Sequence, residues 1–469
     1  MEDKKNKKNL WILTEERPKP EVIITILNIF AKDRSIACIV SPIRILPILE
    51  EGKFKFLYEV IGFHCNKVKN IYIKSISGFS SFVDFLIFYK DEQPTQSDIP
   101  IYAIEETKTD DKESRNTGVY QRASKFVFMD LFHRNINIEK IMLYNLKVGQ
   151  KDSPTDTYIF GTNLLLTLGV RIEGKVLESS VFKPFNTVNE IIDFKSRMRQ
   201  APAGNVGISI KQSGNKIEIS GRLIKSGNLA HDPNIGALSL ICAALRKLGW
   251  GNDIIITEHG LSQSNLSVKN KFIQIANLLD IKIDGLTIPE SQPPANYWKY
   301  ETEGEKLGTI FIHLVVENFT EGYAIFENHA GCEKGYFITK EGNHIPLEKY
   351  SDRQAYKNGN KNKIISIPDL ILIDFEKCEI INVEGKKYEN MKQGIKDLDG
   401  FGDIEELYIK KYYHDFEIIR TVVLYGGTEE KIEEIKVGFL LNKNGDLILA
   451  VWSPCLFKQA IKNLKDYWL

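Results

Sequence analysis

Two apolar runs with charged ends decide the fold of this chain: Ile-Pro-Asp-Leu-Ile-Leu-Ile-Asp-Phe (residues 367–375) and Ile-Ile-Asn-Val-Glu-Gly-Lys-Lys (residues 380–387). Both are rich in β-branched residues and a short acidic turn separates them, which predicts two β-strands. Because side chains alternate across a strand, Glu384 and Lys386 are expected to project from one face. If the strands are neighbours, Asp369 lies beside Glu384, and two carboxylates converge next to an ammonium group.

That combination of side chains has a chemical use. Paired carboxylates bind Mg²⁺, a hard cation that favours oxygen ligands and keeps some of its waters. The ion lowers the pKa of a bound water and neutralises charge that develops on a phosphate. A lysine beside it can position the water or stabilise the transition state. The alternative is that acidic and basic residues simply end two strands at the protein surface.

A second stretch of the chain repeats this order of residues. Asp84 lies in an apolar run, and a second run ends in Glu106-Thr107-Lys108. Each copy is predicted to contain a strand, a second strand, a helix and a third strand. These are residues 81–89, 100–108, 117–132 and 140–144 in the first copy, and residues 367–375, 380–387, 388–395 and 421–425 in the second. The first copy departs from the second in having no proline before its aspartate and a longer gap between its acids.

The repeated pattern resembles the motif of the PD-(D/E)xK nucleases, the superfamily that holds most type II restriction endonucleases. The motif residues here are Pro368, Asp369, Glu384 and Lys386. The resemblance covers roughly residues 50–150 and 335–430 and is weak elsewhere. It implies an α/β fold with two restriction-endonuclease-like mixed-sheet cores flanked by helices, and a middle α+β domain.

The resemblance also implies roles for the motif residues. Asp369 and Glu384 are expected to bind Mg²⁺ in one copy, and Asp84 and Glu106 in the other. Lys386 and Lys108 are expected to orient the attacking water and to stabilise the pentacoordinate state. The implied reaction is hydrolysis of a DNA phosphodiester that leaves a 5′-phosphate and a 3′-hydroxyl.

The length of 469 residues predicts more than one core. We expect a nuclease-like unit in residues 1–155, a middle domain in 156–295 that is either a DNA-recognition module or a scaffold, and a second nuclease-like unit in 296–469. The proline-rich segment 289–294 is the best predicted linker. Strands are expected near residues 308–316 and 323–326, and irregular structure after a helix at 21–31.

The net charge of the chain does not indicate nucleic-acid binding, because 62 basic residues balance 62 acidic residues. Clustered charge can still make a binding patch. The segment 181–230 is locally basic. Within it, Arg197 and Arg199 begin a predicted loop that continues through residues 200–204, and they could contact phosphates or guanine edges, or the loop could be merely solvated. The candidate DNA-binding residues are Arg197, Arg199, Lys211, Gln121 and Gln393.

The cysteines and the apolar runs indicate the compartment. Six cysteines are scattered with no Cys-x-x-Cys pair, which predicts free thiols, without disulfides or a zinc site, in a reducing cytoplasm. Neither a membrane-spanning run nor a signal peptide is expected.

The sequence therefore predicts a Mg²⁺-dependent, site-specific DNA endonuclease of the restriction type, acting on double-stranded DNA as a monomer or a homodimer. Two active sites in one chain could cut one strand each. The first alternative is a nuclease with a different biological role, such as a repair enzyme or an anti-phage effector that acts on DNA or RNA. The second is a non-catalytic nucleic-acid-binding protein whose acid pairs are surface charge.

Overall fold

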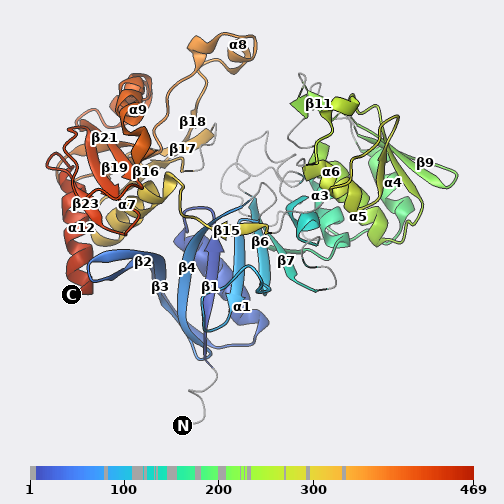
Figure 1. The fold of residues 1–469 in the computed structure, drawn as a ribbon, viewed down its shortest axis with the longest axis horizontal. Helices are drawn as coiled ribbons and strands as arrows, with labels where there is room; N and C mark the ends of the chain where they lie inside the picture. The colour runs from blue at the N-terminus through green and yellow to red at the C-terminus, as the bar shows by residue number, and fades with distance from the viewer. Residues whose placement is uncertain are drawn as a thin grey trace. The chain divides into compact units, whose positions relative to one another are not determined.

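A six-stranded mixed sheet carries the C-terminal pair of strands that the sequence predicts (Figure 1). Its order is β16 (Tyr323–Glu327), β19 (Leu370–Asp374), β20 (Glu379–Lys387), β21 (Glu417–Tyr425), β22 (Val437–Leu441) and β23 (Leu447–Leu449). Strand β20 is antiparallel to β19 and parallel to β21, and β21 is parallel to β22. Strands β19 and β22 are buried along their whole length, as expected for central strands covered on both faces.

The computed structural model describes the chain except residues 1–6, 79–82, 108–119, 121–123, 131–132, 134–135, 145–155, 175–180, 199–207, 222, 226–227, 230–233, 269–270, 292–295 and 330–333. It is a mixed α/β protein with several mixed sheets flanked by helices. The chain divides into two compact units: unit 1 is Met1–Ile76 with Tyr300–Leu469, and unit 2 is Ser77–Lys299. The three consecutive ranges expected from the sequence do not coincide with these units.

Two helices cover opposite faces of the six-stranded sheet. Gly394 of α9 (Met391–Asp397) lies against Val422, whereas Gly308 of α7 (Lys306–Phe319) lies against Val423. Because Val422 and Val423 are successive residues of one strand, their side chains point to opposite faces. The face that carries Glu384 and Lys386 is therefore the face that α9 covers, since these residues pair with Val422 and Leu424.

The prediction of a strand near residues 308–316 is wrong, because this run lies in helix α7. Every residue from Leu307 to Val316 is buried. The helix packs on the sheet and also on α12 (Cys455–Trp468) and β2 (Cys38–Glu50). A helix that is covered on all sides carries no polar stripe, so periodicity cannot distinguish it from a buried strand.

The N-terminal part of unit 1 adds a second group of strands. It consists of β1 (Lys8–Thr14), α1 (Pro20–Asp33), β2, β3 (Lys53–Cys65) and β4 (Val68–Gly78), with the strand order β2-β3-β4-β1. The predicted helix after residue 20 is confirmed, but the segment after it is a strand. Strand β2 accommodates Pro42 and Pro47 because it stands first in the strand order and its register shifts beside both prolines.

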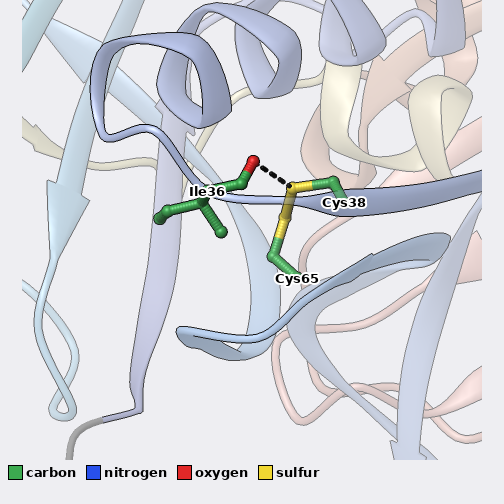
Figure 2. The surroundings of a disulfide bond; sticks show 3 residues. All are labelled: Ile36, Cys38 and Cys65. Atoms are coloured by element: carbon green, nitrogen blue, oxygen red, sulfur yellow. Dashed lines mark hydrogen bonds between the residues drawn. A yellow bond between two sulfur atoms is a disulfide. The ribbon is translucent and has the colours of Figure 1, made fainter.

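A disulfide joins Cys38 to Cys65 across the β2–β3 pair (Figure 2). The prediction that the cysteines are free thiols is therefore wrong for this pair. The two cysteines are 27 positions apart in the chain, and only the hairpin register places them opposite each other. Cys242, Cys378 and Cys455 are free in the described part of the chain.

Unit 2 contains a four-strand series of its own. Strand β5 (Phe85–Tyr89) is antiparallel to β6 (Tyr102–Thr107), and β6 and β7 (Glu139–Tyr144) are parallel, as are β7 and β8 (Arg171–Gly174). Residues 124–130 form a helix between β6 and β7, and α3 (Asp156–Thr167) lies between β7 and β8 in the sequence. The series repeats the antiparallel, parallel, parallel order of β19, β20, β21 and β22.

A smaller mixed sheet completes unit 2. Its order is β14 (Ile281–Ile283), β13 (Asp253–Thr257), β10 (Lys216–Ser220) and β9 (Ser209–Ser213). Helix α5 (Asn234–Lys247) directly precedes β13 in the chain. Unit 2 also contains α4 (Val188–Arg197), α6 (Lys271–Leu278), β11 (Ile224–Lys225) and β12 (Asn228–Leu229).

Unit 1 also contains β17 (Lys334–Ile338), β18 (His344–Glu348), α8 (Arg353–Lys357), α10 (Gly402–Ile404) and α11 (Lys410–Tyr412). Strand β15 (Trp298–Tyr300) lies at the boundary between the two ranges.

Among the described residues, no helix combines the length and the apolar character that a membrane-spanning segment requires.

Removal of the disulfide tests the β2–β3 register. We expect the double variant Cys38→Ala/Cys65→Ala to lower the free energy of unfolding of the oxidised protein by about 2–4 kcal/mol, because the crosslink restricts the unfolded chain. Urea denaturation measures this change. Cys455→Ala, at an exposed free cysteine, is the matched control and should stay within about 0.5 kcal/mol of wild type. A wild-type stability that does not respond to dithiothreitol would contradict the disulfide.

Candidate functional site

The register of β19 and β20 brings Asp369 and Glu384 together. Leu370 pairs with Val383, so the residue before β19 stands opposite Glu384. The backbone confirms this neighbourhood, because the amide of Asp369 donates to the carbonyl of Val383 at 3.1 Å. Oδ2 of Asp369 in turn accepts a hydrogen bond from the amide of Gly385 at 2.8 Å. The expected pairing of the two strands, and the expected proximity of the two acids, are confirmed.

Lys386 contacts two carboxylates on the α9 face of the sheet. Its Nζ donates to Oε1 of Glu384 at 2.5 Å and lies 3.2 Å from Oδ2 of Asp397. Asp397 is the last residue of α9, which crosses this face. The sequence did not single out Asp397, because its role depends on where α9 packs. The ammonium group is thus fixed beside Glu384 by an acid from the helix and an acid from its own strand.

Burial and like charge perturb the two acids. The pKa of Asp369 is raised, first because the carboxyl is buried and then because Glu384 is negatively charged; the Gly385 amide and Lys386 oppose the rise. Burial likewise raises the pKa of Glu384, against the stabilising contact with Lys386. The charge of Glu305, directly before α7, raises the pKa of both acids. Both acids are therefore harder to ionise than they would be in water, because several acids share this site with a single lysine.

Burial alone would lower the pKa of Lys386. Its hydrogen bonds and its attraction to Glu384 and Asp397 outweigh burial, so the pKa is raised and the side chain stays a cation. A permanent positive charge beside a carboxylate pair is suited to binding an anionic group.

Gly385 is required by the close approach of α7. A Cβ at this position would lie 2.6 Å from Cγ2 of Thr309 and 3.0 Å from Oδ2 of Asp369. The amide of Asn328 also donates to the carbonyl of Asp369 at 2.7 Å, which anchors the aspartate from the end of β16. Thr309 and Asn328 therefore fix the backbone that carries the two acids, and the sequence motif contains neither.

A chain of polar side chains continues from Thr309 into the protein. Nδ1 of His329 lies 3.0 Å from the Thr309 hydroxyl, and its Nε2 lies 2.9 Å from Nδ1 of His313. Nε2 of His313 donates to Oε1 of Glu317 at 2.9 Å. Burial lowers the pKa of His329 well below its ordinary value, so this imidazole is neutral. The chain links α7 to the residues that follow β16.

His313, Glu327 and His329 place three potential metal ligands within 4.8 Å of one another. Glu327, however, already contacts two cations: Oε2 accepts from Nε of Arg17 at 2.5 Å, and Oε1 lies 2.6 Å from Nζ of Lys19. These two positive charges neutralise the carboxylate and would repel a divalent ion. The Asp369–Glu384 pair offers oxygen ligands with unbalanced negative charge, so its donor set fits a hard cation such as Mg²⁺ better.

The predicted DNA-binding residues and Lys108 lie at several separate places in the chain. Gln393, on α9, is exposed and donates to Oδ1 of Asp397 at 2.6 Å, which places it beside the acid that holds Lys386. Arg197 is exposed at the end of α4, and its Nε donates to the carbonyl of Asp193. Lys211 is exposed in β9. Lys108, Gln121 and Arg199 lie outside the described residues.

Asp84 and Glu106 are both buried in unit 2, with exposed fractions of 1% and 3%. Oδ2 of Asp84 accepts a hydrogen bond from the amide of Glu106 at 2.8 Å. The carboxylate that lies beside the backbone of Asp84 belongs to Glu105, whose Oε2 accepts from the Asp84 amide at 3.1 Å. Lys125 reaches the same place from the helix at 124–130 and was not singled out from the sequence.

Comparison with protein-family models, with curated proteins and with solved structures finds no match for this chain. A function for this chain therefore has to be inferred from the geometry of its two clusters of acids and lysine.

The close fit around Gly385 makes a stability prediction. We expect Gly385→Ala to lower the free energy of unfolding by about 1–3 kcal/mol, because the new methyl group overlaps Thr309. Adding Thr309→Ser removes Cγ2 and should restore part of the loss. Gly402→Ala, where a Cβ meets nothing within 4 Å, is the control. Equal stabilities for Gly385→Ala and Gly402→Ala, measured by thermal unfolding, would contradict this packing.

Proposed function

We propose that this protein is a Mg²⁺-dependent DNA endonuclease of the restriction type, with a PD-(D/E)xK active site at Asp369, Glu384 and Lys386. The observation that carries the proposal is the convergence of the half-buried carboxylate of Asp369, the buried carboxylate of Glu384 and one lysine at the junction of β19 and β20. The antiparallel and parallel pairings around β20, followed by a helix and a further strand, support it as the core arrangement of that superfamily.

Each residue of the site has a role in the proposed reaction. Asp369 and Glu384 hold the ion, and the backbone contacts from Gly385 and Asn328 fix the orientation of Asp369. A bound Mg²⁺ supplies charge neutralisation and lowers the pKa of a coordinated water. Lys386, held by Glu384 and Asp397, orients the attacking water and stabilises the negative charge that grows on the phosphate.

The proposed reaction is hydrolysis of a DNA phosphodiester by water. The oxygen of water forms a bond to phosphorus while the bond from phosphorus to the 3′-oxygen breaks. The attacking water loses one proton, and the departing 3′-oxygen gains one, which leaves a 5′-phosphate and a 3′-hydroxyl. The raised pKa of the Asp369–Glu384 pair supports the proposal, because a site that needs more positive charge has affinity for a divalent cation.

The metal requirement is the first test. We expect the protein to cut supercoiled plasmid into discrete fragments with Mg²⁺ or Mn²⁺, and to bind DNA without cutting it when Ca²⁺ replaces them. Gel electrophoresis and sequencing of the fragment ends measure both. Complete cleavage in EDTA would rule out the proposed chemistry. Degradation to random fragments, or cleavage of RNA alone, would replace site-specific DNA cleavage with one of the other nuclease activities.

Lys386 provides a second test. Lys386→Ala should lower the rate of cleavage at its site by roughly a hundredfold or more while DNA binding in Ca²⁺ stays nearly unchanged, because the contact forms mainly in the transition state. The control is Lys392→Ala, at an exposed lysine of α9, which should cleave at the wild-type rate. If Lys386→Ala lost binding and rate together, Lys386 would be a phosphate anchor.

A further inference from the structure

The strand register of unit 2 reproduces that of the proposed active site. In unit 1, Leu370, the residue after Asp369, pairs with Val383, the residue before Glu384. In unit 2, Phe85 follows Asp84 and pairs with Ile104, which precedes Glu105. The position opposite Asp84 that corresponds to Glu384 is therefore Glu105, one residue before the glutamate that the sequence motif selects.

A hydrogen bond gives the same correspondence independently. Oδ2 of Asp369 accepts from the amide of Gly385, the residue after Glu384, at 2.8 Å. Oδ2 of Asp84 accepts from the amide of Glu106, the residue after Glu105, also at 2.8 Å. Glu106 thus stands at the position of Gly385, and strand alternation directs its side chain away from the face that carries Glu105.

The same register leaves no lysine at the strand position of Lys386, because Thr107 occupies it. Lys125 supplies the ammonium group from the helix at 124–130. Its Nζ lies 2.8 Å from Oε1 of Glu105 and 3.5 Å from Oδ1 of Asp84. This helix follows β6 in the chain as α9 follows β20, and α9 is the helix that contributes Asp397 to the other site.

We propose that Asp84, Glu105 and Lys125 form a second catalytic site, which performs the same hydrolysis of a DNA phosphodiester by water. The inference rests on the proposed function of the first site. Asp84 and Glu105 are the ligands for the divalent cation, and Lys125 takes the role of Lys386. A lysine moved from strand to helix keeps the chemistry, because only the position of the ammonium group near the carboxylates matters.

Two sites of different construction give one chain the means to cut both strands of an asymmetric target. A single site cuts one strand, so loss of either site should leave a nicking enzyme. Asp84 and Glu105 are almost fully buried, with exposed fractions of 1% and 0%, so neutralising one of them requires a substitution of the same shape. Glu105→Gln meets that need, Lys125→Met removes the ammonium group, and Glu106→Gln is the matched control one residue away.

The experiment combines strand-resolved cleavage with metal binding. Each variant is incubated with supercoiled plasmid and Mg²⁺, and the cut strand is identified by sequencing the ends. Calorimetry with Ca²⁺, on a duplex that carries the mapped wild-type site, counts the bound ions per chain. We expect Glu105→Gln and Lys125→Met to stop at open circles nicked in one defined strand, with linearisation at least about a hundredfold slower. Glu105→Gln should also bind fewer Ca²⁺ ions than wild type, whereas Glu106→Gln should match wild type in both measurements.

The outcomes separate the two proposals. The nick that remains in Glu105→Gln comes from the site at Asp369, so it also shows that the variant is folded. Linearisation by Glu105→Gln at the wild-type rate would overturn the second site and leave the proposed function intact. Loss of all cleavage by Glu105→Gln, or equal nicking by Glu106→Gln, would also overturn the assignment. If wild-type protein cut no DNA with Mg²⁺, the proposed function itself would fail.

Discussion

The pairing of β19 with β20 is the constraint on which the candidate site depends. It brings two carboxylates close together, where loss of water raises the pKa of both and the charge of Glu384 raises that of Asp369 further. The structure tolerates this because Lys386 and the amide of Gly385 meet the two acids directly. This crowding of acids beside one lysine is the basis for the proposed Mg²⁺ site.

The surroundings of this pair are built for rigidity. Helix α7 presses Thr309 against Gly385, and the polar chain through His329 and His313 ties that helix to the end of β16. On the α9 face, Arg420 makes two hydrogen bonds of 2.7 Å to the buried carboxylate of Glu405, which also accepts from Asn382. Packing on one face of β20 and hydrogen bonds on the other thus restrain the groups around this strand. The proposed catalysis would need such fixed positions, because small displacements of catalytic groups lower rates steeply.

The two acid–lysine clusters are related by backbone geometry more closely than by sequence. Both have an aspartate just before a strand, a glutamate opposite it, and an amide of the next residue donating to the aspartate. They differ in the source of the lysine, which is the strand in one unit and the helix in the other. The physical reason for the common features is that the antiparallel pair and the amide together determine where the two carboxylates lie, whereas an ammonium group on a long side chain can reach them from more than one direction.

Local sequence was sufficient for the strands of the C-terminal motif and for the common face of Glu384 and Lys386, because side-chain alternation acts within a few residues. Tertiary structure alone decided that residues 306–319 are helical, that Cys38 meets Cys65, and that Glu105 and Lys125, rather than residues spaced as in a motif, lie beside Asp84. Each of these depends on contacts between segments distant in the chain. A register that shifts by one residue exchanges the faces of every side chain, and sequence spacing cannot detect that shift when two glutamates stand side by side.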